Sequence, residues 1–367
     1  MNLDNIKGIK KLDSKNMLGS LQLLSHQVEE VLEASLATPL KSPLGNGGGL
    51  RIPASYKKID RILVLGMGGS VIGSHVFKTL FSDELKVTVD MVSDYHIPAF
   101  VNNKTLVLAS SYSGNTEEPV NAVKEALKKK AKIMVITSGG KLKAFAKRNK
   151  LPLLNYTTKS NTCDSPRMGL GYSIVGQLVM FAKVGVIKLT NKQIKDIVKT
   201  LVKYEALFGV GQKTKDNPAK LIAKDLLSKK VLYTGAEHLS GSVHICANQM
   251  NENAKRFAVY FLIPELNHHL LEGMIYPASN KNDLAFLLIS SNLYGKKVQK
   301  RFDITVDVLD KNKIKNFTYV CGEKTRLEQV FEVLVLGSYV SYYSAILQNT
   351  DPTAIPFVDY FKEQLSK

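Results

Sequence analysis

Residues 61–81 read RILVLGMGGSVIGSHVFKTLF, and this stretch decides the fold. A short apolar run rich in Ile, Leu and Val ends at a glycine-rich turn, and apolar side chains at helical spacing follow the turn. The order strand, tight turn, helix begins a parallel α/β unit. We therefore expect a strand over 61–66 and a helix over 71–81.

The same alternation continues along the rest of the chain. Further short apolar runs predict strands at 86–92, 105–110, 132–137, 151–155, 231–234, 257–262, 284–290 and 316–321. A long helix is expected over 326–348 and a short closing helix over 356–366. Strands that are apolar along most of their length predict sheets covered on both faces. The predicted fold class is α/β, with two parallel sheets, each flanked by helices.

A length of 367 residues favours two domains. We place an N-terminal helical segment at 1–44, a first α/β domain at 45–190, and a second domain with C-terminal helices at 191–367. Residues 64–75 (VLGMGGSVIGSH) and 232–244 (LYTGAEHLSGSVH) share the order strand, Gly/Ser-rich turn, helix. A repeat as faint as this indicates a duplication only weakly, because chance produces similar ones.

The composition excludes several classes of protein. Hydrophobic residues at 44% and charged residues at 22% are typical of globular proteins. No apolar run approaches the roughly 18–20 residues of a membrane span, so we expect no membrane partner. The N-terminal stretch lacks the apolar centre of a signal peptide. The three cysteines, Cys163, Cys246 and Cys321, form neither a disulfide framework nor a metal-binding pattern. We expect a cytoplasmic protein.

The net charge of +18 raises the question of nucleic-acid binding. The basic residues are spread along the chain with acidic residues between them, and no arginine-rich or aromatic-interleaved block occurs. We therefore expect solvated surface lysines and no nucleic-acid partner. A basic surface also attracts anionic substrates.

The turn at 66–73, GMGGSVIG, places glycines and free helix N–H groups where an anion binds. A dinucleotide-binding turn needs glycine at position 71, where the chain has Val71, although Asp90 resembles the ribose-binding acid of such proteins. A P-loop needs a Gly-Lys-Ser/Thr sequence that the turn lacks. The turn alone therefore indicates an anion site without identifying the ligand.

A second loop, SSYSGNTE at 110–117, also follows a predicted strand and precedes a predicted helix. Ser111, Ser113 and Thr116 bring three hydroxyl groups to the helix N-terminus, where N–H groups and the helix dipole attract anions. Helix capping by Asn115 or Thr116 would explain one hydroxyl group but not three. We interpret the loop as a site for a phosphate monoester.

A third group of polar residues lies in the second domain, in NENAK (251–255) and PELNHH (264–269). Most glutamates are solvated surface charges, but Glu252 ends a helix rich in small and apolar residues. We expect the two flanking amides to orient its carboxylate. His268 follows the apolar run VYFLIPEL (259–266). A carboxylate and an imidazole together suit proton transfer at carbon and oxygen.

These motifs, in this order and together with Ser165-Pro166-Arg167, resemble the bifunctional phosphoglucose/phosphomannose isomerase family of the sugar isomerase (SIS) superfamily. The closing DPTAIPFVDYFKEQL is similar to the C-terminus of that family, and the resemblance covers about 45–367. It implies two SIS domains in a homodimer that needs neither cofactor nor metal. It also implies interconversion of glucose 6-phosphate and fructose 6-phosphate through a cis-enediol, with mannose 6-phosphate as a candidate second substrate.

The resemblance further implies which residues bind the phosphate group. Ser111, Ser113 and Thr116 match the family's phosphate-binding side chains. The backbone of Gly69 and Ser70 matches the turn that completes this site.

Catalytic roles are implied in the same way. Glu252 matches the base that moves a proton between C1 and C2, and Arg167 matches the guanidinium that stabilises the enediolate. His268 matches the residue that opens the sugar ring and reaches the site from the partner subunit. Lys362 matches a lysine that assists ring opening at the ring oxygen.

The chain departs from the family pattern in places. The family reads Asn-His-Asn where this chain has Asn267-His268-His269, so both imidazoles stay candidates, although position favours His268. Ile355 stands where a threonine is associated with the use of mannose 6-phosphate, so we expect that sugar to be a poor substrate.

Two other SIS activities compete with this interpretation. An aminosugar synthase needs an amidotransferase with cysteine at position 2, where the chain has Asn2. The alternative that stays open is a SIS regulator that binds a sugar phosphate without catalysis, a class that usually carries a helix-turn-helix domain before a single SIS unit.

Overall fold

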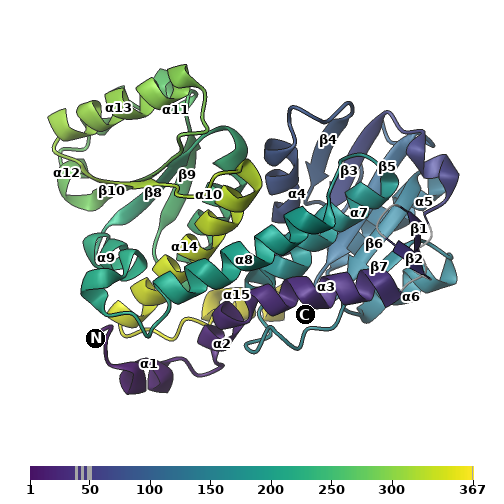
Figure 1. The fold of residues 1–367 in the computed structure, drawn as a ribbon, viewed down its shortest axis with the longest axis horizontal. Helices are drawn as coiled ribbons and strands as arrows, with labels where there is room; N and C mark the ends of the chain where they lie inside the picture. Colours follow the sequence, from purple (N-terminus) through teal and green to yellow (C-terminus); the bar gives the residue numbers. More distant parts are fainter. Residues whose placement is uncertain (38–39, 43–44, 48–51, 366) are drawn as a thin grey trace. The chain divides into compact units, whose positions relative to one another are not determined.

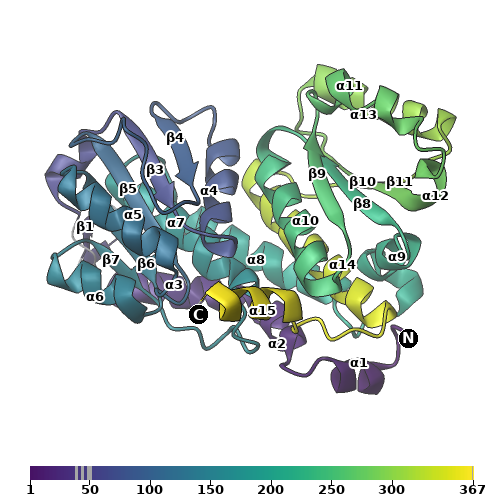
Figure 2. The same cartoon turned by 180° about the vertical axis from the view of Figure 1, so that it is seen from behind.

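The computed structural model describes residues 1–37, 40–42, 45–47, 52–365 and 367. The predicted domain boundary between 44 and 45 falls at residues 43–44, which lie outside this description. The chain divides into two compact units, shown from two sides in Figures 1 and 2. The first unit is Leu23–Lys199, and the second unit joins Met1–Gln22 to Thr200–Lys367. The structure thus assigns the predicted N-terminal segment to both units.

The first unit contains a five-stranded parallel sheet with the order β4-β3-β5-β6-β7. Its strands are β3 (Arg61–Leu65), β4 (Thr88–Val92), β5 (Thr105–Ser111), β6 (Lys132–Thr137) and β7 (Leu153–Asn155). All five predicted strands are confirmed within two residues at either end. A separate short antiparallel pair joins β1 (Leu40–Ser42) to β2 (Gly45–Gly47).

Helices cover both faces of this sheet, as predicted (Figures 1 and 2). One face carries α3 (Leu24–Ala37), α4 (Gly69–Leu80) and α7 (Gly176–Val184), and the other carries α5 (Glu117–Lys128) and α6 (Gly140–Arg148). The chain runs from β3 to β4 in one direction and from β5 to β7 in the other, so right-handed crossovers place α4 opposite α5 and α6. Fully buried apolar side chains fill the α5–α6 face, among them Leu63, Val107, Val123 and Val135.

The second unit contains a four-stranded parallel sheet with the order β11-β10-β8-β9. Its strands are β8 (Lys230–Gly235), β9 (Ala258–Leu262), β10 (Leu284–Ser290) and β11 (Lys315–Val320), again as predicted within two residues. Helices α10 (Ser240–Ala254) and α14 (Arg326–Leu347) pack together on one face, and α13 (Lys296–Lys311) lies on the other. The remaining helices are α1 (Ile6–Leu12), α2 (Met17–Gln22), α8 (Asn191–Phe208), α9 (Pro218–Asp225), α11 (Leu266–His269), α12 (Asn280–Asp283) and α15 (Pro356–Leu365).

Helix α14 corrects one prediction from the sequence. By length and composition it is apolar enough to cross a membrane, so the statement that no apolar run approaches that length is wrong. Within the protein, however, 94% of its most apolar window is buried. It packs against α9 and α10, and Tyr342 Oη donates to Asp13 Oδ2 at 3.1 Å. Its apolar sequence is accounted for by its place in the core of the second unit.

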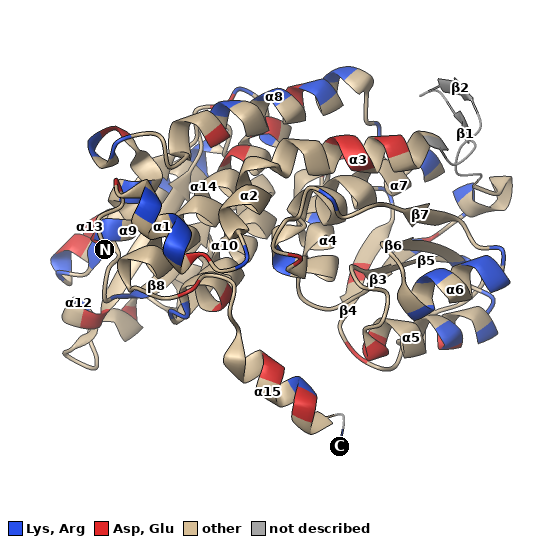
Figure 3. Ribbon diagram, turned by 90° about the horizontal axis from the view of Figure 1, so that it is seen from below, with Lys and Arg blue, Asp and Glu red and all other residues tan. Residues whose placement is uncertain are grey.

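The positive charge is distributed over many elements. Lys and Arg lie on α1, α6 and α8 among others, and Asp and Glu lie on α3, α5 and α15 (Figure 3). The net charge of +18 is therefore not gathered on one element.

Candidate active site

Two loops of the first unit meet where the strand order of its sheet reverses. β3 pairs with β5, with Leu65 opposite Ala109, so the turn after β3 and the loop after β5 leave neighbouring carboxyl ends. Ligands of open α/β sheets bind at such a switch point. A Cβ atom at Gly66 would lie 2.9 Å from Ser110 O, so glycine is needed there for the two strands to end side by side.

The predicted phosphate-binding hydroxyl groups lie together in these loops. Ser111 Oγ lies 2.9 Å from Thr116 Oγ1, and it accepts a hydrogen bond from Gly114 N at 3.1 Å. Ser113 is exposed, and its Oγ accepts from Asn115 N at 3.2 Å. Ser70 Oγ accepts from the N–H of Tyr112 at 3.0 Å and so joins the turn after β3 to the loop after β5. Hydroxyl groups of the two loops therefore fix the conformation of the loop after β5 by bonding one another and its backbone N–H groups.

The helices that follow these loops start without side-chain caps. α4 begins after Gly68, which has a φ of +48° and carries no side chain to cap with. α5 begins after Thr116, whose side chain makes no capping hydrogen bond. The simple capping explanation of the second loop is therefore wrong for Thr116. Asn115 Oδ1 instead accepts from Lys141 N, at the start of α6. At the start of α4, Ser70 N donates to Met67 O at 3.1 Å and Val71 N donates to Gly68 O at 3.2 Å, which leaves Gly69 N for an anion. The first N–H groups of α5 can serve an anion in the same way.

Arg167 lies beside the turn after β3. It belongs to a short 3₁₀ turn, Pro166–Met168, and its side chain is buried. A Cβ atom at Gly69 would lie 3.1 Å from Pro166 O and 3.4 Å from Arg167 Cα, so the two segments touch along their backbones. The structure therefore brings Arg167, Gly69 and Ser70 together with the hydroxyl loop, within one unit.

A buried polar network supports this arrangement, and the sequence analysis missed it. Asn161 Nδ2 donates to Tyr112 Oη at 2.8 Å and to Ser165 O at 2.9 Å, while Tyr112 Oη donates to Asp164 Oδ1 at 3.1 Å. Burial raises the pKa of the Tyr112 hydroxyl. The network fixes the segment before Arg167 against the hydroxyl loop. The tyrosine inside the SSYSGNT motif was the one signal of it in the sequence.

Helix α7 and the turn before it hold the other side of the α4 N-terminus. Gln177 Nε2 donates to Ser70 O at 2.8 Å, and Ser74 Oγ donates to Gln177 Oε1 at 2.5 Å. Ser173 Oγ donates to Gly69 O at 2.7 Å. These hydrogen bonds hold the backbone carbonyl groups of Gly69 and Ser70 in place. No pattern in the sequence indicated them.

Glu252 lies near the end of α10 in the second unit and is half-buried. The predicted orientation of its carboxylate by both flanking amides is wrong for Asn251, whose side chain bonds the backbone of Ala247 and Ala258. Asn253 is buried and donates to Ser341 Oγ at 3.1 Å. The amides thus fix the end of α10 to β9 and to α14.

His268 lies at the other end of β9, on the one-turn helix α11 rather than at the end of a strand. It is exposed, and its side chain makes no hydrogen bond or ring contact with any residue that the structure describes. The neighbouring His269 ring lies 5.9 Å from the ring of Phe261 in β9. Of the two imidazoles, His269 is the one with a ring contact to a strand of its own sheet.

Lys362 lies on α15, which has no buried residue. Apolar side chains of this helix are strongly exposed: Phe357 by 87%, Tyr360 by 62%, Phe361 by 61% and Leu365 by 65%. α15 stands apart from the other helices of the second unit in Figure 3. The structure does not bring Lys362 together with Glu252 or His268.

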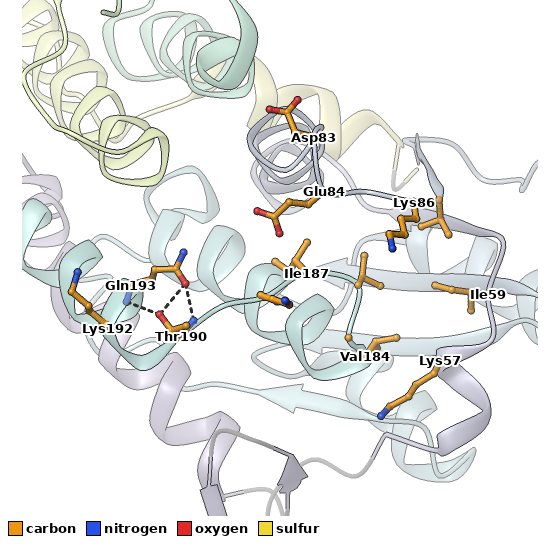
Figure 4. Close-up of a pocket in the computed structure, with 14 residues that line it drawn as sticks. Lys57, Ile59, Asp83, Glu84, Lys86, Val184, Ile187, Thr190, Lys192 and Gln193 are labelled. Atoms are coloured by element: carbon orange, nitrogen blue, oxygen red, sulfur yellow. Dashed lines mark hydrogen bonds between the residues drawn. The ribbon is translucent and has the colours of Figure 1, made fainter. Parts of the chain in front are cut away.

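A cavity of about 1070 Å³ lies in the first unit, at the end of the sheet opposite the phosphate loops. Its lining includes Lys57, Glu84, Lys86, Ile187 and Lys192 and none of the predicted site residues (Figure 4). It is therefore separate from the site described above. Among the residues that the structure describes, no three His, Cys, Asp or Glu side chains are grouped as metal ligands.

Comparisons with known proteins identify the two domains that carry these residues. Residues 215–365 match the family described as bacterial phospho-glucose isomerase C-terminal SIS domain, and residues 55–150 match the SIS domain. The prediction of two SIS domains is thus confirmed.

Curated relatives cover nearly the whole chain. A bifunctional phosphoglucose/phosphomannose isomerase of Caldicellulosiruptor bescii is 33% identical over 88% of this chain and 94% of its own length. One of Thermoplasma volcanium is 30% identical over 86% of this chain and 96% of its own. Among solved structures, a hypothetical protein of Thermus thermophilus shares the fold, with a TM-score of 0.72, 16% identity and coverage of 99% of this chain and 93% of the other. The chain therefore belongs to the bifunctional phosphoglucose/phosphomannose isomerase family.

Proposed function

We propose that the protein is a cofactor-independent glucose-6-phosphate isomerase that interconverts glucose 6-phosphate and fructose 6-phosphate through a cis-enediol. The observation that carries the proposal is the pair of helix N-termini without side-chain caps, α4 and α5, at the switch point of a chain in this family. N–H groups and hydroxyl groups that converge at two helix N-termini suit the oxygens of a phosphate monoester.

A coupled assay tests this function directly. The purified protein is given fructose 6-phosphate with glucose-6-phosphate dehydrogenase and NADP, and we expect NADPH to form in proportion to the protein added. Binding of fructose 6-phosphate is measured in parallel by calorimetry. Binding without turnover would overturn the proposed activity and favour the alternative, a SIS regulator that binds a sugar phosphate.

In the first unit, we assign the phosphate group to Ser113, Thr116 and the backbone turn at Gly69 and Ser70. The N–H of Gly69 is the donor of this turn, because Ser70 N donates to Met67 O at 3.1 Å. Ser111 is buried and bonded to Thr116, so its part is to shape the loop as well as to complete the site. Arg167, beside Gly69, is the group we assign to the enediolate. A guanidinium suits this task because its planar donors match two oxygens of a planar anion.

In the second unit, we assign proton transfer between C1 and C2 to Glu252, ring opening to His268, and assistance at the ring oxygen to Lys362. A half-buried carboxylate on a fixed segment is a suitable base, because its position relative to the reacting carbons can be held constant. His268 is accessible, as a group that must reach a sugar ring has to be.

The positions of Glu252 and His268 support a site shared between two copies in a homodimer. Glu252 follows Asn251, which is bonded to the first residue of β9, and His268 lies on α11, six residues after the last residue of that strand. At about 3.3 Å per residue, the two ends of this five-residue strand are roughly 13 Å apart. Since base and ring-opening group must reach adjacent carbons of one sugar, we assign His268 to the site of the partner copy.

Exposed apolar side chains support the same assembly. Ile275 and Tyr276, which follow α11, are exposed by 51% and 78%, and α15 exposes a row of aromatic and aliphatic residues. Apolar surface of this extent marks an interaction site. We place the enzyme in the cytoplasm, in line with three buried cysteines that form no disulfide.

A further inference from the structure

The helix that carries His268 is short, and one of its contacts to the sheet is the His269 ring against Phe261 of β9. α11 has four residues, and a single helical turn is not stable by its own hydrogen bonds. Leu266 is its one buried residue. A cavity of about 380 Å³ is lined by Asn267 of α11, by Leu271 and by residues of α13. Leu266 and the His269 ring therefore anchor α11 to the sheet, and a polar connection joins Asn267 to α13.

That connection is a closed set of hydrogen bonds among Asn267, Arg301 and Thr305, which we call the α11 bracket. Asn267 Nδ2 donates to Thr305 Oγ1 at 2.8 Å, and Thr305 Oγ1 donates to Arg301 O at 2.7 Å. Arg301 Nη1 donates to Asn267 Oδ1 at 3.2 Å. Thr305 is fully buried. Both ends of the Asn267 amide are thus held by α13.

The orientation of this amide follows from the donors around it. The Thr305 hydroxyl donates its one proton to Arg301 O, so it accepts from Asn267, and the guanidinium of Arg301 only donates. If the Asn267 amide were flipped, its NH₂ group would face the N–H group of Arg301, and the two donors could not form a hydrogen bond. The bracket therefore has one arrangement that satisfies all of its groups, and it fixes the residue directly before His268.

We propose that the α11 bracket is a positioning device for His268, with Thr305 and Asn267 as positioning residues that touch no substrate. The inference rests on the proposed role of His268. An exposed imidazole on an unsupported turn would sample many positions, and a displacement of about 1 Å can cost about 10²-fold in rate. The bracket keeps the ring where a partner site can use it.

The matched variants are Thr305→Val, which keeps the shape but removes the hydroxyl, and Thr305→Ser, which keeps the hydroxyl. We expect Thr305→Val to lower kcat for glucose 6-phosphate about tenfold to 10²-fold with KM unchanged, because the phosphate group binds elsewhere. Thr305→Ser should keep the wild-type kcat. Hydrogen exchange should rise in the segment that contains α11 for Thr305→Val and not for Thr305→Ser, whether or not the protein is active.

A double-mutant cycle separates positioning from general damage. In a His268→Ala background, Thr305→Val should have no further effect on kcat, because the ring that it positions is gone. An equal loss in both backgrounds, or an unchanged kcat and unchanged exchange in Thr305→Val, would overturn the inference. If His268→Ala abolishes turnover while Thr305→Val does not affect it, the proposed function stands and the bracket is only structural. If His268→Ala itself has no effect, the role of His268 fails first.

Discussion

Asn251 and Ala258 exchange two hydrogen bonds that tie the end of α10 to the start of β9. Asn251 Nδ2 donates to Ala258 O at 2.7 Å, and Ala258 N donates to Asn251 Oδ1 at 3.0 Å. The same amide donates to Ala247 O at 3.0 Å. All of its polar atoms are therefore used on the backbone. Glu252, the next residue, lies on a segment with little freedom, as the base of a proton transfer should.

We expect Glu252→Gln to lower kcat by about 10²–10⁴-fold, the usual effect of a positioned acid–base group. Glutamine keeps the shape and the hydrogen-bonding reach but cannot take the proton. Exchange of the substrate C2 proton with deuterated solvent, followed by NMR, should fall together with turnover. KM for the sugar phosphate should change little, because the phosphate site belongs to the first unit.

Glu252→Asp is the matched control, since it keeps the carboxylate and moves it back by one methylene. Its activity should lie between those of the wild type and Glu252→Gln. A Glu252→Gln protein that still exchanges the C2 proton at the wild-type rate would show that the base is elsewhere, and Glu237 and Glu265 would be the next residues to replace.

Replacing Ser113 by Ala together with Thr116 by Val should raise KM for fructose 6-phosphate by more than tenfold, or more than about 1.4 kcal/mol in binding free energy. These two hydroxyl groups are the accessible ones of the loop. Thr116→Ser keeps the hydroxyl and should keep the wild-type KM. The comparison is made by steady-state kinetics in the coupled assay. An unchanged KM in the double variant would remove the loop from phosphate binding.

The fold was predictable because its signals are local. Apolar runs such as RILVL and TLVLAS predict buried parallel strands from local sequence alone. The glycine-rich turn after β3 predicts that another segment or a ligand comes close to its backbone. The proximity of Ser111, Ser113 and Thr116 was predictable for the same reason, since they lie within six residues of one another.

The supports of the site were not predictable, because they come from distant parts of the chain. Asn161 and Gln177 reach the phosphate loops across 49 and 107 residues, respectively. The α11 bracket joins residues 38 positions apart. The place of α14 was not predictable either, because composition alone cannot tell an apolar core helix from a membrane span.

Lys183 predicts a pH dependence of stability. Its side chain is buried, Nζ donates to Ser35 O at 3.0 Å, and burial lowers the pKa of the amine from 10.5 to about 8. Below pH 8 the Lys183 amine is charged in the folded state, and its burial lowers the free energy of unfolding. Between pH 8 and 10.5 the folded protein has lost the proton while the unfolded chain still binds it, so this contribution to stability becomes more favourable as pH rises.

At neutral pH, Lys183→Met should therefore have a larger free energy of unfolding, relative to wild type, than it has at high pH. The difference in free energy of unfolding between variant and wild type should fall by about 1–3 kcal/mol from pH 7 to pH 10.5. Urea denaturation at several pH values measures it. Lys188→Met, which removes an exposed amine nearby, is the control for the loss of one charge. A difference that is independent of pH would contradict the assigned cause.

Mannose 6-phosphate should be a poor substrate, because Ile355 stands where a threonine is expected to help. Ile355 is partly exposed and directly precedes α15. We expect Ile355→Thr to raise the mannose 6-phosphate rate by about tenfold, the effect of one hydrogen bond of about 1.4 kcal/mol. Ile355→Val, which matches threonine in shape, should not. A wild-type mannose rate equal to the glucose rate would contradict the expectation.

Subunit complementation tests the shared site. Glu252→Gln and His268→Ala are each expected to keep only a small residual activity alone. When the two variants are mixed and reassociated one to one, half of the dimers are hybrids. If His268 serves the partner copy, each hybrid contains one site with both groups intact and one with neither, so activity should return to about a quarter of the wild-type level. If Glu252 and His268 of one chain serve one site, no hybrid site is intact and nothing returns.

The matched control is the double variant Glu252→Gln/His268→Ala mixed with wild type. In this mixture the hybrid dimers are active only if each site is confined to one chain. With shared sites both sites of a hybrid lack one group, so only the wild-type dimers contribute, at about a quarter of full activity. With sites confined to one chain, each hybrid keeps one intact site and the mixture reaches about half. Recovery in the first mixture together with a quarter in the second would place His268 in the partner site. No recovery in the first and half in the second would confine each site to one chain, which the separation of Glu252 and His268 along β9 argues against.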